Sequence, residues 1–275
     1  MKGRIQAALE NAKRRTGDIP DAKTRGASSG ERPTINLAMR SFQRVPYDPI
    51  ECAQNRVLVP ESDRALRATG AAAYRMLRTR LLQRCRSNNW RTIGITSPGQ
   101  GAGKSLTSLN LALTIAREGN NNVFLIDLDM RNPKMCQYLG ATPPVDINHY
   151  MSGEVRAEDS LFSVGIDNLT LGGTLTNTDL ASELLASGRL EELFAYIYAI
   201  APEPLILVDL PPLLSTDDAM IVAPIVDACL LVVAEGLSRR DGTGKALELL
   251  AEYKLAGIVL NRSHAVVKDY YSSYA

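Results

Sequence analysis

The chain has 275 residues, 45% of them hydrophobic, and a formal net charge of +1 from 31 basic and 30 acidic side chains. This size allows one sizeable core with or without an appendage, and the balanced charge creates no overall field that would attract DNA, so we expect no nucleic acid partner. Four scattered cysteines without C-x-x-C spacing argue against a zinc site and a disulfide framework, and predict free, mostly buried thiols: Cys52, Cys85, Cys136 and Cys229.

The N-terminal part is predicted to be a short helix and a flexible arm, residues 1–60. Apolar residues recur with helical spacing over 5–12, and the stretch 16–56 is polar, contains Gly and Pro, and has no sustained periodicity. The short helix is either a weakly ordered cap on the domain or a docking helix for a partner. Helical spacing returns over 62–86, with a basic face of a kind that is usually only solvated: Arg75, Arg78, Arg80, Arg84 and Arg86.

From Arg91 onward, short apolar runs alternate with helical patterns. We expect strands over 93–96, 123–127, 169–171, 205–209, 229–233 and 258–260, and helices over 105–118, 180–198, 217–225 and 240–253. This order is typical of an α/β fold, a doubly wound and mainly parallel sheet with helices on both faces. We assign it to a domain over 61–265, followed by a flexible tyrosine-rich tail over 266–275. Ligands of such sheets bind beyond the carboxyl ends of the strands.

The segment Thr96–Ser105, T-S-P-G-Q-G-A-G-K-S, joins a predicted strand to a predicted helix and has the pattern of a phosphate-binding loop. Its glycines allow backbone N–H groups to turn toward a polyphosphate, and the helix N-terminus adds partial positive charge. Pro98 stands where the usual pattern has glycine, and we interpret it as a variant. The expected nucleotide-binding residues of this loop are Gly99, Gln100, Gly101, Ala102, Gly103, Lys104, Ser105 and Leu106.

Three aspartates stand at the predicted ends of two strands. Asp127 and Asp129 are two residues apart and would project to one side, and Asp209 ends another apolar run before two prolines. A single aspartate there is more often a turn or capping residue, and we expect only a capping role for Asp217 or Asp218. Three carboxylates beside a phosphate loop predict a cation between them.

In this order, the loop, Asp127-x-Asp129-x-Arg131 and Asp209-x-Pro-Pro212 resemble the bacterial tyrosine kinases of exopolysaccharide and capsule synthesis. The fold of that family belongs with the MinD and ParA class of P-loop ATPases. The resemblance covers about residue 57 to the C-terminus, and the first residues and the tail are similar to autokinases of exosortase-associated systems. It implies ATP and Mg²⁺ as cofactors.

The resemblance also implies roles in phosphoryl transfer. Lys104 and Mg²⁺ would clamp the phosphates, with Ser105, Asp129 and Asp209 holding the ion. By family likeness Asp127 would accept the proton of the incoming tyrosine, and Arg131 and Asn261 would contact the nucleotide. The expected acceptors lie in the tail, and transfer between subunits is favoured: Tyr270, Tyr271 and Tyr274.

The resemblance further implies partners. They are a membrane polysaccharide co-polymerase (chain-length regulator) whose cytoplasmic tail activates the kinase, a cognate tyrosine phosphatase, and further copies of the chain. No apolar run reaches the roughly 20 residues of a membrane span, so we expect a cytoplasmic protein recruited to the inner face of the plasma membrane by its partner. Related kinases form rings through Glu-x-x-Arg-x-x-Arg, but here Ala72 precedes Arg75 and Arg78, which leaves the oligomer open.

Two other functions remain possible at this point. A positioning or partitioning ATPase of the MinD/ParA class would carry a signature lysine where this chain has Gly99. A nucleotide switch that gates polysaccharide assembly would need no tyrosine chemistry. Transfer of labelled phosphate to the protein separates both from an autokinase.

Overall fold

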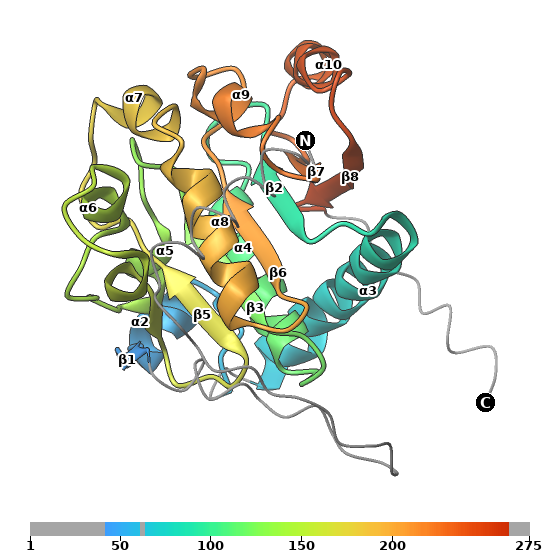
Figure 1. Cartoon of the computed structure of the whole chain (residues 1–275). Coiled ribbons are helices and arrows are strands. Elements are labelled where there is room, and N and C mark those ends of the chain that lie inside the picture. Colours follow the sequence, from blue (N-terminus) through green and yellow to red (C-terminus); the bar gives the residue numbers. More distant parts are fainter. Residues whose placement is uncertain (1–41, 61–63, 264–275) are drawn as a thin grey trace, which may run out of the picture.

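The structure, a computed structural model, describes residues 42–60 and 64–263, with the side chains of 64–69 left out. Its centre is an eight-stranded sheet in the order β1-β4-β5-β3-β6-β2-β7-β8, parallel except for the β4–β5 pair (Figure 1). The strands are β1 (Gln43–Arg44), β2 (Thr92–Thr96), β3 (Val123–Asp127), β4 (Phe162–Ser163), β5 (Leu169–Gly172), β6 (Leu205–Asp209), β7 (Ala228–Ala234) and β8 (Leu255–Asn261). The predicted mainly parallel α/β sheet is confirmed.

Helices cover both faces of this sheet. One face packs against α2 (Pro49–Gln54), α3 (Arg64–Asn88), α4 (Lys104–Ala116) and α5 (Met135–Leu139). The other packs against α6 (Ile147–Met151), α7 (Ala181–Leu185), α8 (Arg189–Ile200), α9 (Asp218–Val222) and α10 (Arg240–Leu249). A short 3₁₀ helix, η2, spans Ala157–Ser160.

The central strands β2, β3 and β6 are mainly apolar because both of their faces are buried. In β3, Val123 and Leu125 belong to the hydrophobic cluster under α3 and α4, while Phe124 and Ile126 belong to the cluster under α8. This alternation is the period of two that an extended chain imposes. The aspartates at the ends of β3 and β6 come where these apolar runs end, at the carboxyl ends of the strands.

The folded domain begins earlier than predicted, and the flexible arm over 1–60 is wrong for residues 42–60. Cys52, Val57 and Val59 are buried in the core, and β1 pairs with β4. Asn110 in α4 accepts a hydrogen bond from the Leu58 N–H (2.8 Å). These contacts are long-range, so the polar, aperiodic sequence gave no signal for them. Residues 1–41 and 264–275, which include the predicted first helix and the tyrosine tail, lie outside the described residues.

The structure also tests smaller predictions about single helices, strands and cysteines. The helix expected over 180–198 is two helices: α7 ends at Leu185 with Ala186 as its C-cap, and Gly188, with a left-handed backbone (φ 84°), is the N-cap of α8. The short elements β4, α5, α6 and η2 were not predicted. All four cysteines are free and buried, as expected. Within the described ranges, no helix combines the length and hydropathy that crossing a membrane requires.

Candidate active site

The loop between β2 and α4 contains two glycines in the left-handed backbone region. Gly101 has φ 77° and Gly103 has φ 85°, values that other residues rarely adopt. A Cβ atom on Gly103 would lie 2.3 Å from the Asn261 side-chain nitrogen, whereas one on Gly99 would meet no atom within 4 Å. The loop conformation therefore requires glycine at 101 and 103, and not at 99.

Backbone N–H groups of this loop are available to a ligand. From Gly99 to Ser105, none of them donates a hydrogen bond to any residue of the described ranges, and the first to do so is Thr107 N, which donates to Gly103 O (2.9 Å). The loop also forms the N-terminus of α4, where the helix dipole adds partial positive charge. Such a set of unpaired donors suits a phosphate chain.

Lys104, the first residue of α4, lies among carboxylates rather than in solvent. Its Nζ forms an ion pair with Asp129 and lies 3.7 Å from Asp209 Oδ2. It also donates to Ser105 Oγ (3.2 Å). Burial alone lowers the pKa of Lys104, but Asp209 and Asp129 together raise it above its usual value. The ammonium group therefore stays charged and holds the ends of β3 and β6 together.

Asp127 and Asp209 are paired residues at the ends of adjacent strands. Asp127 is fully buried, and its carboxylate accepts hydrogen bonds from Asp129 N (3.1 Å) and Met135 N (3.3 Å). Burial and, next, the Asp209 carboxylate raise the pKa of Asp127 well above the usual carboxyl value. Asp127 thus orders the loop after β3 and is a stronger base than an ordinary carboxylate.

One carboxylate oxygen of Asp209 accepts a hydrogen bond, and the other has only the longer ion-pair contact with Lys104. Oδ1 accepts a hydrogen bond from Ser108 Oγ (3.0 Å), while the buried Oδ2 accepts none from the described residues. Burial raises the pKa of Asp209, and Lys104 offsets this only in part. A buried carboxylate oxygen that accepts no hydrogen bond, beside two further carboxylates and only one ammonium group, fits a divalent cation.

Magnesium suits this arrangement because it binds through one or two carboxylates, substrate phosphates and several waters. Among residues 42–60 and 64–263, no three or more His, Cys, Asp or Glu side chains come together as a group that could hold a metal ion by themselves. The predicted ligands Ser105, Asp129 and Asp209 all lie within the cluster around Lys104 Nζ. The donor set therefore fits an ion that shares its coordination with a nucleotide.

Asn261, the last residue of β8, contacts the phosphate loop directly. Its side-chain Nδ2 donates a hydrogen bond to the Ala102 carbonyl (2.9 Å). It therefore lies beside Gly103 at the start of α4, together with the other predicted loop residues. Gln100 is exposed and Leu106 half-buried in the same region.

Arg131 is the one predicted nucleotide residue that is paired elsewhere. Its Nε lies 2.7 Å from Asp218 Oδ2 and its Nη2 lies 3.3 Å from Asp218 Oδ1, and Nη2 also donates to Ser182 Oγ (3.1 Å). Burial raises the pKa of Asp218, but hydrogen bonds from Arg131 and Ser182 outweigh it and lower the pKa below its usual value.

The cluster of Arg131, Ser182 and Asp218 was not predicted. Asp217 or Asp218 was expected only to cap a helix, yet Asp218 is buried, and the N-cap residue Asp217 makes no capping hydrogen bond. The available signal was the Asp217-Asp218 pair, which begins five residues after Pro212, together with an arginine that follows β3.

A comparison with models of protein families found no match. Curated relatives were found. The tyrosine-protein kinase YwqD of Bacillus subtilis (strain 168) is 32% identical over 193 residues, which cover 68% of this chain and 79% of that protein. The tyrosine-protein kinase CpsD of Streptococcus agalactiae is 30% identical over 187 residues, 66% of this chain and 80% of that protein.

Solved structures agree with this assignment. The chimerical protein CapA2B2 has a TM-score of 0.64 at 26% identity, with 69% of this chain and 83% of that chain covered. The cell division ATPase MinD of Pyrococcus furiosus has a TM-score of 0.53 at 25% identity, with 63% and 74% covered. Because two tyrosine-protein kinases match this chain at 30% identity or more, with about four fifths of each relative covered, the chain belongs to the family of bacterial tyrosine kinases.

Proposed function

We propose that this kinase transfers the γ-phosphoryl group of ATP to tyrosines of its own C-terminal cluster, Tyr270, Tyr271 and Tyr274, in a neighbouring copy, and that this transfer regulates exopolysaccharide or capsule assembly. The observation that carries the proposal is the single site where unpaired loop N–H groups, one ammonium group and three carboxylates meet. Phosphoryl transfer needs mainly positioning and charge stabilisation, which such groups supply.

Each group has a role in the proposal. The loop N–H groups from Gly99 to Ser105 receive the phosphates, and Lys104 leaves its carboxylate partners to stabilise charge on the β- and γ-phosphates. Ser105, Asp129 and Asp209 would hold Mg²⁺, which neutralises the phosphate charge when it is bound. Asn261 adjoins the loop, where it is suited to contact the nucleotide.

The reaction also needs a proton acceptor. A bond forms between the tyrosine oxygen and the γ-phosphorus, the bond from that phosphorus to the β-phosphate oxygen breaks, and ADP leaves. We assign the phenol proton to Asp127, because a base with a raised pKa is better matched to neutral pH than an ordinary carboxylate. The two backbone hydrogen bonds of Asp127 leave further lone pairs on its carboxylate.

The proposal gives Arg131 a positioning role. Its bidentate pair with Asp218 fixes the segment that directly follows Asp129. As partners we propose further copies of the chain, a membrane polysaccharide co-polymerase that recruits the kinase to the inner face of the membrane, and a tyrosine phosphatase. These partners come from the family likeness and not from a described surface.

Incubation with γ-labelled ATP and Mg²⁺ tests the function. We expect label on the wild-type protein, and its loss both in Lys104→Met and in the joint change of Tyr270, Tyr271 and Tyr274 to Phe. The activating cytoplasmic tail of the co-polymerase is included in a parallel reaction. Release of free phosphate without labelled protein, in both reactions, would instead identify a MinD-like ATPase or a nucleotide switch.

A further inference from the structure

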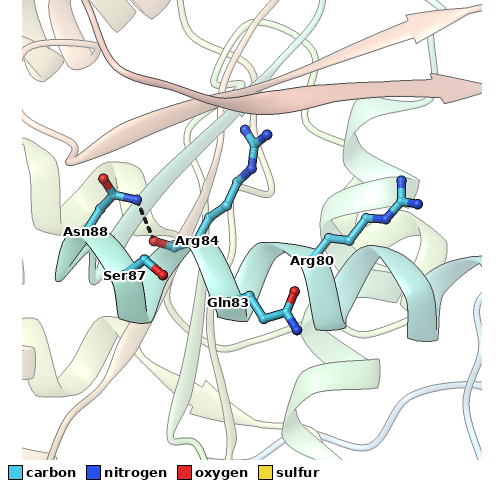
Figure 2. A pocket seen from close by; sticks show the side chains of 5 residues that line it. All are labelled: Arg80, Gln83, Arg84, Ser87 and Asn88. Atoms are coloured by element: carbon cyan, nitrogen blue, oxygen red, sulfur yellow. Dashed lines mark hydrogen bonds between the residues drawn. The ribbon is translucent and has the colours of Figure 1, made fainter.

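A hollow of about 350 Å³ lies on the surface of α3, near the C-terminal end of that helix. Figure 2 shows the guanidinium groups of Arg80 and Arg84 projecting from the same side of the helix. The lining contains hydrogen-bond donors and no acidic side chain: Arg80, Gln83, Arg84, Ser87 and Asn88. Its chemistry therefore favours an anionic ligand.

The charge of this hollow is not compensated by the surrounding protein. Helix α3 carries seven arginines and no acidic residue. Arg78 pairs with Glu118 (3.5 Å), but neither Arg80 nor Arg84 forms an ion pair with any described carboxylate. Two exposed guanidinium groups are thus available to bind an anion.

Arg84 is also held in place. Its Nη1 donates a hydrogen bond of 2.6 Å to the carbonyl of Ala256 in β8, the strand at the edge of the sheet. This bond uses one of the five guanidinium N–H groups and limits the rotamers of the side chain. A fixed guanidinium loses less entropy when it binds a ligand than a mobile one does.

We propose that this hollow binds the phosphorylated C-terminal tyrosines of the same chain, an inference that rests on the proposed autokinase function. A phosphotyrosine carries about −1.5 to −2 charges near neutral pH and three strong acceptor oxygens. Arginine pairs are the usual partners of such a group because the guanidinium plane matches two phosphate oxygens. A small hollow lined by five side chains matches one phosphate better than a flat lipid surface.

The chain is long enough for this contact. Ala256, at the level of Arg84, precedes Ser263 by seven residues, and Tyr270 follows Ser263 by seven residues. An extended chain spans about 3.3 Å per residue, so a segment that turns back along β8 brings Tyr270 or Tyr271 to Arg84. Arg262 has φ 55°, a left-handed conformation found in turns, directly before this segment.

Binding of this kind removes a phosphorylated tail from the active site of the neighbouring copy. An unphosphorylated tail lacks the charge that the two arginines recognise, so it stays available as an acceptor. Helix α3 would then distinguish the two states of the tail.

The test uses a fluorescent peptide of residues 264–275 with phosphate on Tyr270 and Tyr271, and no ATP. The binding protein is the full chain with Tyr270, Tyr271 and Tyr274 changed to Phe. We expect the phosphopeptide to bind at least about tenfold more tightly than the unmodified peptide. Joint Arg80→Gln and Arg84→Gln should weaken binding at least about tenfold, and Arg80→Gln alone, which leaves the Ala256 contact intact, should weaken it in part.

The matched control is joint Arg75→Gln and Arg86→Gln, which removes the same charge from exposed positions of α3 outside the hollow. It should retain binding within about twofold. Wild-type protein that is already phosphorylated should bind the added peptide at least about tenfold more weakly until a phosphatase removes its own phosphates.

Equal losses in the two double variants would overturn the proposal, and so would equal binding of the two peptides. Binding only to phosphatidylglycerol vesicles, or only to a second copy of the chain, would assign the hollow to a membrane or to an oligomer contact instead. Because no ATP is present, these outcomes are independent of the γ-label experiment. Peptide binding without autophosphorylation would leave the hollow as an anion site and reject the kinase role.

Discussion

Two charged clusters lie beyond the carboxyl ends of the strands, and they differ in how fully their charges are paired. Arg131 and Asp218 form a bidentate pair supported by Ser182, and the pKa of Asp218 is lowered. Lys104 instead lies beside Asp129 and Asp209, with Asp127 adjacent, and the pKa values of Asp127 and Asp209 are raised. We call the first the balanced cluster, because its charges are paired and it stabilises the fold. We call the second the unbalanced cluster, because its carboxylates outnumber its ammonium group and it can still bind a cation.

The largest expected effect comes from removal of the ammonium group at the unbalanced cluster. Lys104→Met should reduce label transfer about 1,000-fold or more, because charge on the phosphates loses its main protein partner. The exposed Lys254→Met is the control and should keep wild-type activity. A rate within tenfold of wild type in labelling assays would contradict the assignment of Lys104.

The loop that positions Lys104 offers a matched pair of changes. Gly103→Ala should reduce transfer about 100-fold, because alanine is strained at φ 85° and displaces Asn261. Gly99→Ala meets no atom within 4 Å and should stay within about threefold of wild type. Nucleotide affinity and label transfer are measured on both variants. Equal losses in Gly103→Ala and Gly99→Ala would contradict the conclusion that the loop requires glycine at 103 and not at 99.

The balanced cluster should respond in stability more than in catalysis. Asp218→Asn removes the negative charge that pairs with Arg131 and should lower the free energy of unfolding by about 2 kcal/mol. Asp217→Asn, on the exposed neighbour that also accepts from Ser182 (3.1 Å), should cost less than about 0.5 kcal/mol. Denaturant titration measures the free energy of unfolding of both variants. Equal losses in the two variants would show that the burial of Asp218 is unimportant for stability.

The smallest effect expected is on the pH dependence of stability. A carboxyl whose pKa is raised by folding keeps its proton longer in the folded protein, so the free energy of unfolding falls as pH rises from the ordinary carboxyl range to the raised pKa. For Asp127 and Asp209 this predicts a lower melting temperature toward neutral pH, and Mg²⁺ should restore a few degrees, about 1 kcal/mol.

The Asp218 pair has the opposite sign, because its lowered pKa contributes stability that is lost only as pH falls below the ordinary carboxyl range. Calorimetry of the nucleotide-free protein between about pH 3 and pH 8, with Mg²⁺ or K⁺ at equal ionic strength, separates the two clusters. A melting temperature that Mg²⁺ leaves unchanged at pH 8 would argue against a cation at the unbalanced cluster.

Local pattern and sheet geometry together predicted the unbalanced cluster. Lys104 follows a glycine-rich loop, and Asp127 and Asp209 end apolar runs, so a parallel sheet must bring their strand ends to one edge. The balanced cluster was not predictable in this way. Arg131 and Asp218 are 87 residues apart, and their contact depends on how α7 and α9 pack over the sheet.

The start of the domain was missed for a related physical reason. Strand β1 has two residues and α2 has six, too short for periodicity to be recognised. Cys52 and Val57 become core residues only through contacts with segments that follow much later in the chain. The tyrosine tail and the first predicted helix stay predictions, because they lie outside the described ranges.

The hydrogen bond from Asn261 to the Ala102 carbonyl joins the last strand to the loop that surrounds the phosphates. In the proposed mechanism the acceptor tyrosines follow residue 261 in the sequence, so a pull on that segment would act first on a side chain that contacts this loop. Tension or ordering in the proposed acceptor segment would thereby be transmitted to the predicted ATP-binding loop through one hydrogen bond.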